Sequence, residues 1–371
     1  MTGQEIRIEL GERSYPVHVG AGVLSSLAKL LTESGLSRDV VVVSDRNVAK
    51  LYLSSIRRQL AESGISAEYL VLPPGEKQKS LAVAGRIYTS MLQRRVGRSA
   101  TIVAVGGGVI GDLAGFVAAT YHRGIRLVHV PTTLLAQVDS SIGGKTGVNH
   151  PLGKNLIGAF YQPAFVLADT RTLRTLPVRE IFCGMGEVVK YGIILDNQLF
   201  QYLEISLDKV IGLDEEALVH VGTQCIRLKA GLVSRDERES GERIVLNCGH
   251  TIGHALEAAG GYRTLKHGEA VLLGLLAESV IAKEMGIMDP STYERIAALI
   301  LRIPLNVKTP AIKVPTVLAM IPRDKKTLHG KNRFVLPIRI GETKVVENVS
   351  PSLIKQALSS VRKMRFQSSV T

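Results

Sequence analysis

The order of apolar and polar positions divides the chain into two parts of different character. Up to about residue 175, short runs rich in β-branched residues alternate with helical patterns, which is typical of an α/β domain with a largely parallel sheet. The expected strands cover residues 40–44, 69–72, 101–105, 127–130 and 165–167. Residues 1–20 alternate apolar and polar positions, so we expect an exposed hairpin before these strands.

From about Pro177 onward the spacing of apolar residues becomes helical. The expected helices cover residues 215–232, 251–259, 269–285 and 291–301, whereas residues 333–337 and 343–346 indicate a late pair of strands. We therefore expect an α/β domain with a Rossmann-like parallel sheet in residues 1–176. An all-α C-terminal domain, apart from the strand pair, should follow in residues 177–371. A cleft between the two domains is the expected ligand site.

A glycine-rich turn follows the expected strand at residues 101–105. Gly106, Gly108 and Gly111 leave no Cβ in the way of a ligand, and the helix expected at residues 110–119 favours negative charge at its N-terminus. A dinucleotide pyrophosphate fits this description, although many helix-packing turns show the same pattern. The ordinary Rossmann pattern also needs an acidic residue about 20 positions later. After Asp112 no carboxylate appears until Asp139, so other segments would have to hold the adenosine.

The composition limits the classes of function. The 371 residues suffice for two domains, and the content of 45% hydrophobic and 21% charged residues is ordinary for a globular protein. Forty-six Lys and Arg against 33 Asp and Glu give a net charge of +13, which favours phosphorylated metabolites, nucleotides or nucleic acid as partners. The chain has no tryptophan, 5% aromatic residues and no short basic tract, which argues against nucleic-acid binding.

The cysteines and the apolar segments indicate a cytoplasmic protein. Cys183, Cys225 and Cys248 show neither a disulfide framework nor the spacing of a thiolate zinc site. The N-terminus lacks the pattern of a signal peptide. The most apolar stretch, residues 271–282, is interrupted by Gly274 and Glu278 and is too short to span a bilayer, so we expect no membrane association.

Four residues of the helical half are candidates for holding a metal ion. His250 and His254 are four positions apart on one expected helix, Glu187 lies in the sequence GMGEVVKYG, and His267 begins HGEAV. Zinc accepts nitrogen and oxygen ligands of this kind, and a catalytic zinc usually keeps three protein ligands. One of the four should therefore be spare, and spacing alone favours His250 with His254. The alternative is that these histidines make ordinary hydrogen bonds in the core or at the surface.

A resemblance to a known family covers nearly the whole chain. The sequence contains, in this order, PPGEKQKS, AVGGGVIGDLAGF, VPTTLLAQVDSSIGGKTGVNHPLGKN, TLPVREIFCGMGEVVKYG, NCGHTIGHALE, HGEAV and DKK…RFVLP. These blocks resemble the signature blocks of the 3-dehydroquinate synthases, in the order of that family. The resemblance implies NAD+ in the N-terminal domain, Zn2+ in the cleft with Co2+ as an alternative metal, and a homodimer.

The resemblance also implies roles for individual residues. It implies the metal ligands Glu187, His250 and His267, which leaves His254 beside the substrate. The residues implied for NAD+ are Asp45, Glu76, Lys79, Gly107, Gly108, Val109, Gly111, Asp112, Thr132, Thr133, Asp139, Lys145, Lys154, Thr172 and Thr175. Those implied for the substrate are Lys145, Asn155, Lys190, Lys229, Arg243, Asn247, His254 and one of Lys325 and Lys326, with the partner subunit's Arg123 at the phosphate.

The reaction that the resemblance implies consumes a phosphorylated sugar acid. In that family, NAD+ oxidises the C5 hydroxyl of 3-deoxy-D-arabino-heptulosonate 7-phosphate, which acidifies the C6 proton and allows β-elimination of phosphate. Hydride then returns to C5, and ring opening with an intramolecular aldol closure gives 3-dehydroquinate, an intermediate of the shikimate pathway to aromatic amino acids. Because NAD+ is regenerated, the enzyme is a carbon–oxygen lyase.

Other functions fit parts of this pattern. A related cyclase could use sedoheptulose 7-phosphate or glucose 6-phosphate, but Lys229, Arg243 and Lys325 or Lys326 favour a substrate that carries a carboxylate. Metal-dependent alcohol and glycerol phosphate dehydrogenases share the architecture and release reduced cofactor. A non-catalytic basic binding protein would contain no metal and would bind nucleic acid with a steep salt dependence.

Overall fold

The computed structural model describes residues 3–36, 38–305, 313–321 and 332–367. The chain divides into two compact units, of which the first comprises Met1–Leu176 and Glu215–Arg238 and the second Pro177–Asp214 and Glu239–Thr371. Helix α8 (Glu215–Arg235) therefore belongs to the first unit, although the sequence analysis assigned it to the C-terminal domain. The physical reason is its apolar stripe of Ile226, Ala230 and Val233, which packs with residues of strands β1 and β2.

The first unit contains a seven-stranded sheet in the order β1-β2-β9-β6-β5-β3-β4. The strands are β1 (Gly3–Ile8), β2 (Tyr15–Gly20), β3 (Asp39–Asp45), β4 (Ser66–Leu72), β5 (Thr101–Gly106), β6 (Arg126–Pro131) and β9 (Phe165–Asp169). All neighbours pair in parallel except β1 with β2, so the predicted strands and the largely parallel sheet are confirmed. The hairpin β1–β2 also forms, but β2 is half-buried or buried along its length because it pairs with β9.

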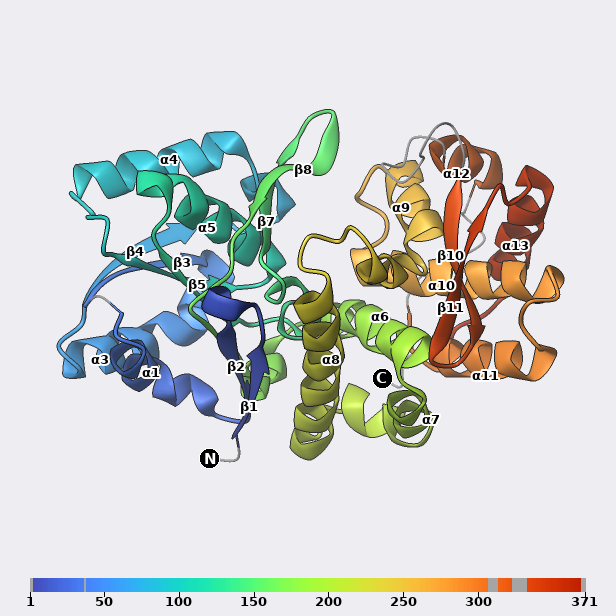
Figure 1. Cartoon of the computed structure of the whole chain (residues 1–371), viewed down its shortest axis with the longest axis horizontal. Helices are drawn as coiled ribbons and strands as arrows, with labels where there is room; N and C mark the ends of the chain where they lie inside the picture. The colour runs from blue at the N-terminus through green and yellow to red at the C-terminus, as the bar shows by residue number, and fades with distance from the viewer. Residues whose placement is uncertain (1–2, 37, 306–312, 322–331, 368–371) are drawn as a thin grey trace. The chain divides into compact units, whose positions relative to one another are not determined.

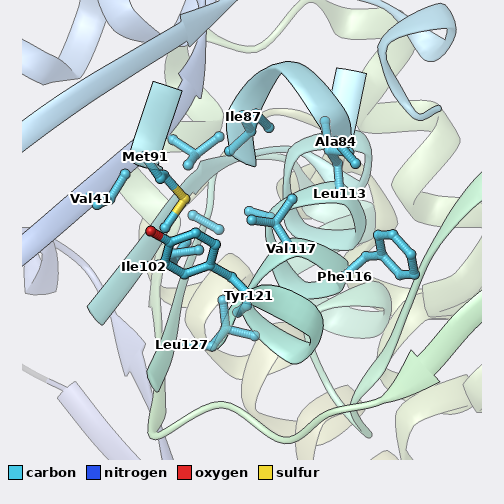
Figure 2. Packing of buried hydrophobic residues seen from close by; sticks show 14 of the residues in the cluster. Val41, Ala84, Ile87, Met91, Ile102, Leu113, Phe116, Val117, Tyr121 and Leu127 are labelled. Atoms are coloured by element: carbon cyan, nitrogen blue, oxygen red, sulfur yellow. The ribbon is translucent and has the colours of Figure 1, made fainter. Parts of the chain in front are cut away.

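Helices cover both faces of this sheet (Figure 1). They are α1 (Leu27–Glu33), α2 (Arg46–Val48), α3 (Ser54–Glu62), α4 (Leu81–Gln93) and α5 (Gly108–Thr120). Alternate residues of β3 enter different cores: Val40 and Val42 pack with α1 and α3, whereas Val41 and Val43 pack with α4 and α5. Figure 2 shows the second of these cores around Met91. Burial on both faces explains why β3 is a continuous apolar run.

A separate two-stranded sheet follows the six strands from β1 to β6. Strands β7 (Lys145–His150) and β8 (Gly153–Phe160) pair antiparallel, and Figure 1 shows their connection as a projecting arm of the first unit. Helix α5 packs against β7 so closely that a Cβ atom at Gly115 would lie 2.4 Å from Thr146 Cγ2. This contact fixes the arm beside the helix that follows the glycine turn.

The second unit is mainly helical. Its helices are α6 (Val178–Leu195), α7 (Asn197–Ile211), α9 (His250–Ala259), α10 (His267–Glu284), α11 (Pro290–Leu301), α12 (Val314–Met320) and α13 (Pro351–Lys363). The expected late strands also form, as β10 (Arg333–Arg339) and β11 (Glu342–Glu347), which pair antiparallel. Within the described ranges, no helix is both long enough and apolar enough to cross a membrane.

Helix α10 is the centre of the second unit, with residues 268–282 all buried. Two of its glycines let other helices approach it backbone to backbone. A Cβ atom at Gly268 would lie 1.7 Å from the carbonyl oxygen of Cys183 on α6, and one at Gly274 would lie 1.9 Å from that of Gly249, which precedes α9. The absence of these Cβ atoms therefore brings α6 and the start of α9 against α10.

Candidate active site

The glycine turn of the first unit joins β5 to α5 and borders a small pocket. A Cβ atom at Gly107 would lie 3.0 Å from Thr133 Cγ2, and one at Gly108 would lie 3.1 Å from Ser140 Oγ. The pocket is lined by residues that include Gly106, Gly108, Gly111, His129, Ser140 and Ser141. The first N–H groups of a helix lack intrahelical partners and favour an anion. The glycines therefore let Thr133 and Ser140 lie close to the turn, and the start of helix α5 favours an anionic ligand.

His129 is a pocket residue that the sequence analysis did not identify. It lies on β6, is 5% exposed, and its ring is 3.6 Å from the position of a Cβ atom at Gly111. Burial lowers the pKa of His129 to about 4, so the imidazole is neutral near pH 7. A polar residue within the apolar run LVHVP was the available signal.

Lys79 contacts two other residues with predicted roles, Asp112 and Asn155. The Lys79 ammonium, at a residue that is 5% exposed, contacts a carboxylate oxygen of Asp112 and the side-chain oxygen of Asn155. Burial raises the pKa of Asp112, and the positive charge of Lys79 opposes this effect. Glu76 is nearby in sequence and accepts a hydrogen bond from Asn149 at 2.7 Å. The structure thus connects the segment before α4, the start of α5 and the β7–β8 arm.

A second buried lysine joins two other predicted residues. Lys229 of α8 donates to Asp139 Oδ1 at 2.6 Å and to the Asp139 carbonyl oxygen at 2.7 Å. Asp139 lies in a helical turn (Ala136–Ser140) that also supplies Ser140 to the pocket. Lys229, expected among substrate residues of the C-terminal domain, is therefore part of the first unit and partners a residue expected at NAD+.

Two further groups of predicted NAD+ residues have local partners in the first unit. Asp45, at the carboxyl end of β3, accepts hydrogen bonds from the backbone N–H groups of residues 47 and 48 and so caps α2. Thr172 and Thr175 lie in a short helix (Thr170–Thr175), where Thr172 Oγ1 accepts from Gln137 Nε2 at 3.0 Å and Thr175 bonds to the Tyr52 hydroxyl.

The remaining predicted residues are spread over several elements. Lys325 and Lys326 lie outside the described residues. Arg123 is exposed at the end of a short helix (Tyr121–Arg123), with a left-handed φ of 64°. The others occupy the first turn of α5, the segment after β6, and the β7–β8 arm, and are Val109, Thr132, Thr133, Lys145 and Lys154.

In the second unit, three helices bring Glu187, His250 and His267 together. Glu187 Oε1 lies 3.5 Å from His250 Nε2 and 3.5 Å from His267 Nε2, and the three ligand atoms all lie within 4.8 Å of one another. Two atoms bound at about 2.0–2.1 Å to one tetrahedral zinc would be about 3.4 Å apart. The donor set and its spacing therefore fit a zinc or cobalt ion.

In both His250 and His267, the Nδ1 atom of the ring faces an oxygen atom. His250 Nδ1 is 3.1 Å from the Cys248 carbonyl oxygen, and His267 Nδ1 is 3.0 Å from Glu257 Oε2. Because these oxygens accept hydrogen bonds, they favour the N–H at Nδ1, so that a metal ion would bind at Nε2 and, in His267, replace the proton there. Burial lowers the pKa of His267, but hydrogen bonds to Glu187 and Glu257 and their charges outweigh burial and raise it to about 10.

Lys190 and His254 border the same three side chains. The Lys190 ammonium forms an ion pair with the second carboxylate oxygen of Glu187, and the two side chains are 2% and 1% exposed. The His254 ring lies 5.3 Å from that of His250 and 6.0 Å from that of His267. A second combination, His254 with Glu257 and His267, also brings possible ligand atoms within 4.8 Å. All four candidate metal-binding residues are therefore neighbours.

Arg243 and Asn247 lie in one short helix of the second unit (Glu242–Asn247) that contacts α6 and β10. The Arg243 side chain is 1% exposed and is the largest fully buried side chain among the described residues. Arginine keeps its charge at any ordinary pH, so a buried guanidinium is suited to an anion held at a fixed position. Arg243 can therefore supply a bidentate contact to a carboxylate.

The sequence analysis did not assign a role to the buried acids Glu257 and Glu278. Glu257 follows His250 by seven positions and lies on the same face of α9, which places it at His267. Glu278 is 0% exposed and accepts hydrogen bonds from the backbone N–H groups of Gly249 and Ile252. A charged residue inside the apolar stretch of residues 271–282 was the signal for this contact.

Comparison with known protein families matches most of the chain. Residues 69–183 match 3-dehydroquinate synthase N-terminal, and residues 184–327 match 3-dehydroquinate synthase C-terminal. The two matches are contiguous, and together they contain the glycine turn, the β7–β8 arm and the candidate metal ligands Glu187, His250 and His267.

Two similar solved structures are sugar phosphate cyclases with bound cofactors. One is 2-deoxy-scyllo-inosose synthase complexed with carbaglucose-6-phosphate, NAD+ and Co2+, which is 28% identical over 96% of this chain and 99% of that chain, with a TM-score of 0.85. Another is 2-epi-5-epi-valiolone synthase from Streptomyces hygroscopicus subsp. jinggangensis 5008 with NAD+ and Zn2+ bound. It is 28% identical over 95% of this chain and 98% of that chain, with a TM-score of 0.86.

A more distant structure shares the fold. Glycerol dehydrogenase from Schizosaccharomyces pombe is 17% identical over 95% of this chain and 93% of that chain, with a TM-score of 0.65. At that level of identity the likeness concerns architecture alone.

Proposed function

The chain belongs to the 3-dehydroquinate synthase family of sugar phosphate cyclases, and from that premise we propose that it converts 3-deoxy-D-arabino-heptulosonate 7-phosphate to 3-dehydroquinate and phosphate. This lyase reaction would place the enzyme in the shikimate pathway to aromatic amino acids. The two contiguous family matches support the assignment, and they include every described residue with a proposed role except Asp45.

The observation that supports an anionic substrate is the burial of Arg243. A guanidinium that is 1% exposed is suited to a carboxylate or a phosphate. The resemblance implies that Arg243 binds the carboxylate, which sedoheptulose 7-phosphate and glucose 6-phosphate lack. Lys229, also buried, is a second cation that the resemblance implies for the substrate. A substrate with both a carboxylate and a phosphate also agrees with the excess of basic residues.

We propose NAD+ and Zn2+ as the cofactors, with Co2+ as an alternative metal. The glycine turn and the start of α5 would hold the pyrophosphate, while Glu187, His250 and His267 would hold the metal. When bound, NAD+ supplies reversible hydride transfer at C5, and the metal supplies Lewis-acid polarisation of the reacting hydroxyl. The protein then has to bind the anionic ends of the substrate and move the hydroxyl proton.

We propose that His254 takes part in that proton transfer. Its ring lies beside those of the two histidine ligands, but it is not itself a ligand when Glu187, His250 and His267 bind the metal. An imidazole is suited to proton transfer because its ordinary pKa is near neutral pH. Asn247 and Lys190 are the proposed hydrogen-bonding partners of the substrate in the same unit. Lys190 also holds Glu187 through the carboxylate oxygen that does not face the histidines.

Arg243→Gln tests the assignment of the substrate. We expect kcat/KM for 3-deoxy-D-arabino-heptulosonate 7-phosphate to fall at least about a hundredfold, because an ionic partner of the carboxylate is lost. Arg295→Gln, which removes a surface guanidinium paired with Glu204, is the matched control and should leave kcat/KM unchanged. A wild-type enzyme that turns over sedoheptulose 7-phosphate or glucose 6-phosphate but not the acid would contradict the assignment.

A related sugar phosphate cyclase is the second candidate. The observation that favours it is the 28% identity to the inosose and valiolone synthases over nearly the whole chain. A substrate panel with the three sugar phosphates, NAD+ and Zn2+ distinguishes the two candidates through the substrate from which phosphate is released.

A further inference from the structure

A wholly buried carboxylate of α10 binds the first turn of α9. Glu278 is 0% exposed, and its Oε2 atom accepts a hydrogen bond from Gly249 N–H at 2.5 Å. Its Oε1 atom is 3.3 Å from the N–H of Ile252. The first N–H groups of a helix need partners of this kind, and a buried carboxylate needs donors to replace its lost hydration. The contact therefore fixes the start of α9 against α10.

The peptide group between Cys248 and Gly249 connects this carboxylate to His250. The N–H of that peptide donates to Glu278, and its C=O is 3.1 Å from His250 Nδ1. A carbonyl oxygen can only accept, so the contact favours the proton on Nδ1. His250 Nε2 then points towards Glu187 Oε1, at 3.5 Å.

We propose that Glu278 is a positioning residue of the metal centre and acts on His250 through the Cys248–Gly249 peptide. Hydrogen bonds in a chain polarise one another, so the carboxylate strengthens the acceptor that orients the imidazole. Glu257 contacts the other histidine, His267, without an intervening peptide. Both histidines are thus supported by a buried carboxylate. This inference rests on the proposed metal site.

The experiment compares metal binding by the full-length wild type and Glu278→Gln. Glutamine keeps the size of the side chain, removes its charge and places an NH2 group where one of the two backbone donors needs an acceptor. By competition with a chromophoric chelator, we expect the apparent Kd for Zn2+ to rise about 10- to 100-fold. We also expect the visible spectrum of bound Co2+ to change, because its coordination geometry depends on the His250 ring.

Ser279→Ala is the matched control, since Ser279 is the next residue on the same helix and is also 0% exposed. Metal affinity and the Co2+ spectrum should stay at their wild-type values in this variant. Urea unfolding of the metal-free proteins separates a general loss of stability from a loss of metal binding. An unchanged Kd and Co2+ spectrum in Glu278→Gln would overturn the proposal, whatever the change in stability.

Glu278→Asp keeps the charge but has a shorter reach, and it replaces Glu278→Gln if that variant does not fold. The same measurements decide: weaker Zn2+ binding with an altered Co2+ spectrum supports the proposal, and wild-type values overturn it. A wild-type protein that binds no Zn2+ would contradict the metal site on which the inference rests. Wild-type binding together with unaffected variants would contradict only the role of Glu278.

Discussion

At the scale of single residues, burial decides which protonation states are available. Glu187, Lys190 and Arg243 are each at most 2% exposed, so polar atoms of the protein or of bound ligands have to replace the water around these side chains. Burial also raises the pKa of the Cys183 thiol to about 12, which keeps it protonated and unreactive near pH 7. By contrast, His129 is kept neutral by burial in the pocket of the first unit.

The neutral state of His129 predicts a pH dependence of stability. Its pKa is about 4 in the folded protein, against an ordinary value of 6.5 for an exposed histidine, so the unfolded chain takes up a proton first as the pH falls. This residue should therefore lower the free energy of unfolding by about 2 kcal/mol between pH 7 and pH 5. Urea unfolding of wild type and His129→Gln measures the difference. Equal pH dependence in both proteins would contradict the prediction.

His254→Ala should retain the metal and lose turnover. Removal of a proton-transfer group is expected to lower kcat about 10²- to 10⁴-fold, whereas Glu187, His250 and His267 remain to bind the metal. Metal content and steady-state kinetics are measured together, with His220→Ala as a control from α8 in the first unit. Stoichiometric loss of metal in His254→Ala would count against the proposed division of roles.

The sequence identified the four metal-site candidates, but spacing alone favoured His250 with His254, whereas the resemblance implied His250 with His267. His250 and His254 share a face of α9, yet His250 Nε2 and His267 Nε2 are the atoms that face Glu187. That choice depends on the packing of three helices, which local periodicity does not encode. The roles of Glu257 and Glu278 were missed for the same reason, because their partners lie on neighbouring turns and helices.

At the scale of elements, glycines on α10 determine how the site residues meet. Gly268 contacts α6, which carries Glu187, and Gly274 contacts the segment that begins α9, which carries His250. Backbone contact at these points leaves no room for a Cβ atom. Substitutions at these glycines should therefore disturb the metal site through the positions of whole helices.

Gly268→Ala should destabilise the protein by about 3 kcal/mol and weaken metal binding. The new Cβ atom would lie 1.7 Å from the Cys183 carbonyl oxygen, so α6 and α10 must separate. Gly85→Ala is the matched control, because Gly85 is also within a helix but has nothing within 4 Å of the new atom. It should stabilise by about 0.5–1 kcal/mol. Urea unfolding curves in which both variants behave alike would contradict this account.

Most elements could be predicted from the sequence because their patterns are local. The β-branched run of β3 and the apolar period of α11 each identify one element with little dependence on the rest of the chain. The membership of α8 in the first unit was not predicted, since one helical stripe can pack on either unit. The partial burial of β2 likewise depends on a long-range pairing with β9.

At the scale of the whole molecule, each unit supplies a different part of the proposed chemistry. The first unit contains the glycine turn and the cations Lys79 and Lys229, whereas the second contains the metal candidates and Arg243. Binding of NAD+ and metal can therefore be measured as separate properties of the full chain. The homodimer that the resemblance implies would add the partner subunit's Arg123 as a phosphate ligand.

Mixed dimers test the proposed role of Arg123. Arg123→Ala and His254→Ala should each be nearly inactive, but mixed dimers should regain activity because one of the two sites then contains both native residues. The two variants are co-expressed, each with a different affinity tag, and mixed dimers are isolated by purification on both tags in turn. Sedimentation gives their mass. Monomeric wild-type protein, or mixed dimers without restored activity, would contradict this arrangement.

The most direct test of the central claim follows phosphate, 3-dehydroquinate and NADH in one reaction. It contains the enzyme, Zn2+, 3-deoxy-D-arabino-heptulosonate 7-phosphate and far less NAD+ than substrate. We expect phosphate and 3-dehydroquinate in equal amounts, many turnovers for each NAD+, and no accumulation of NADH. Formation of NADH in proportion to the substrate consumed, or no release of phosphate, would contradict the proposed function.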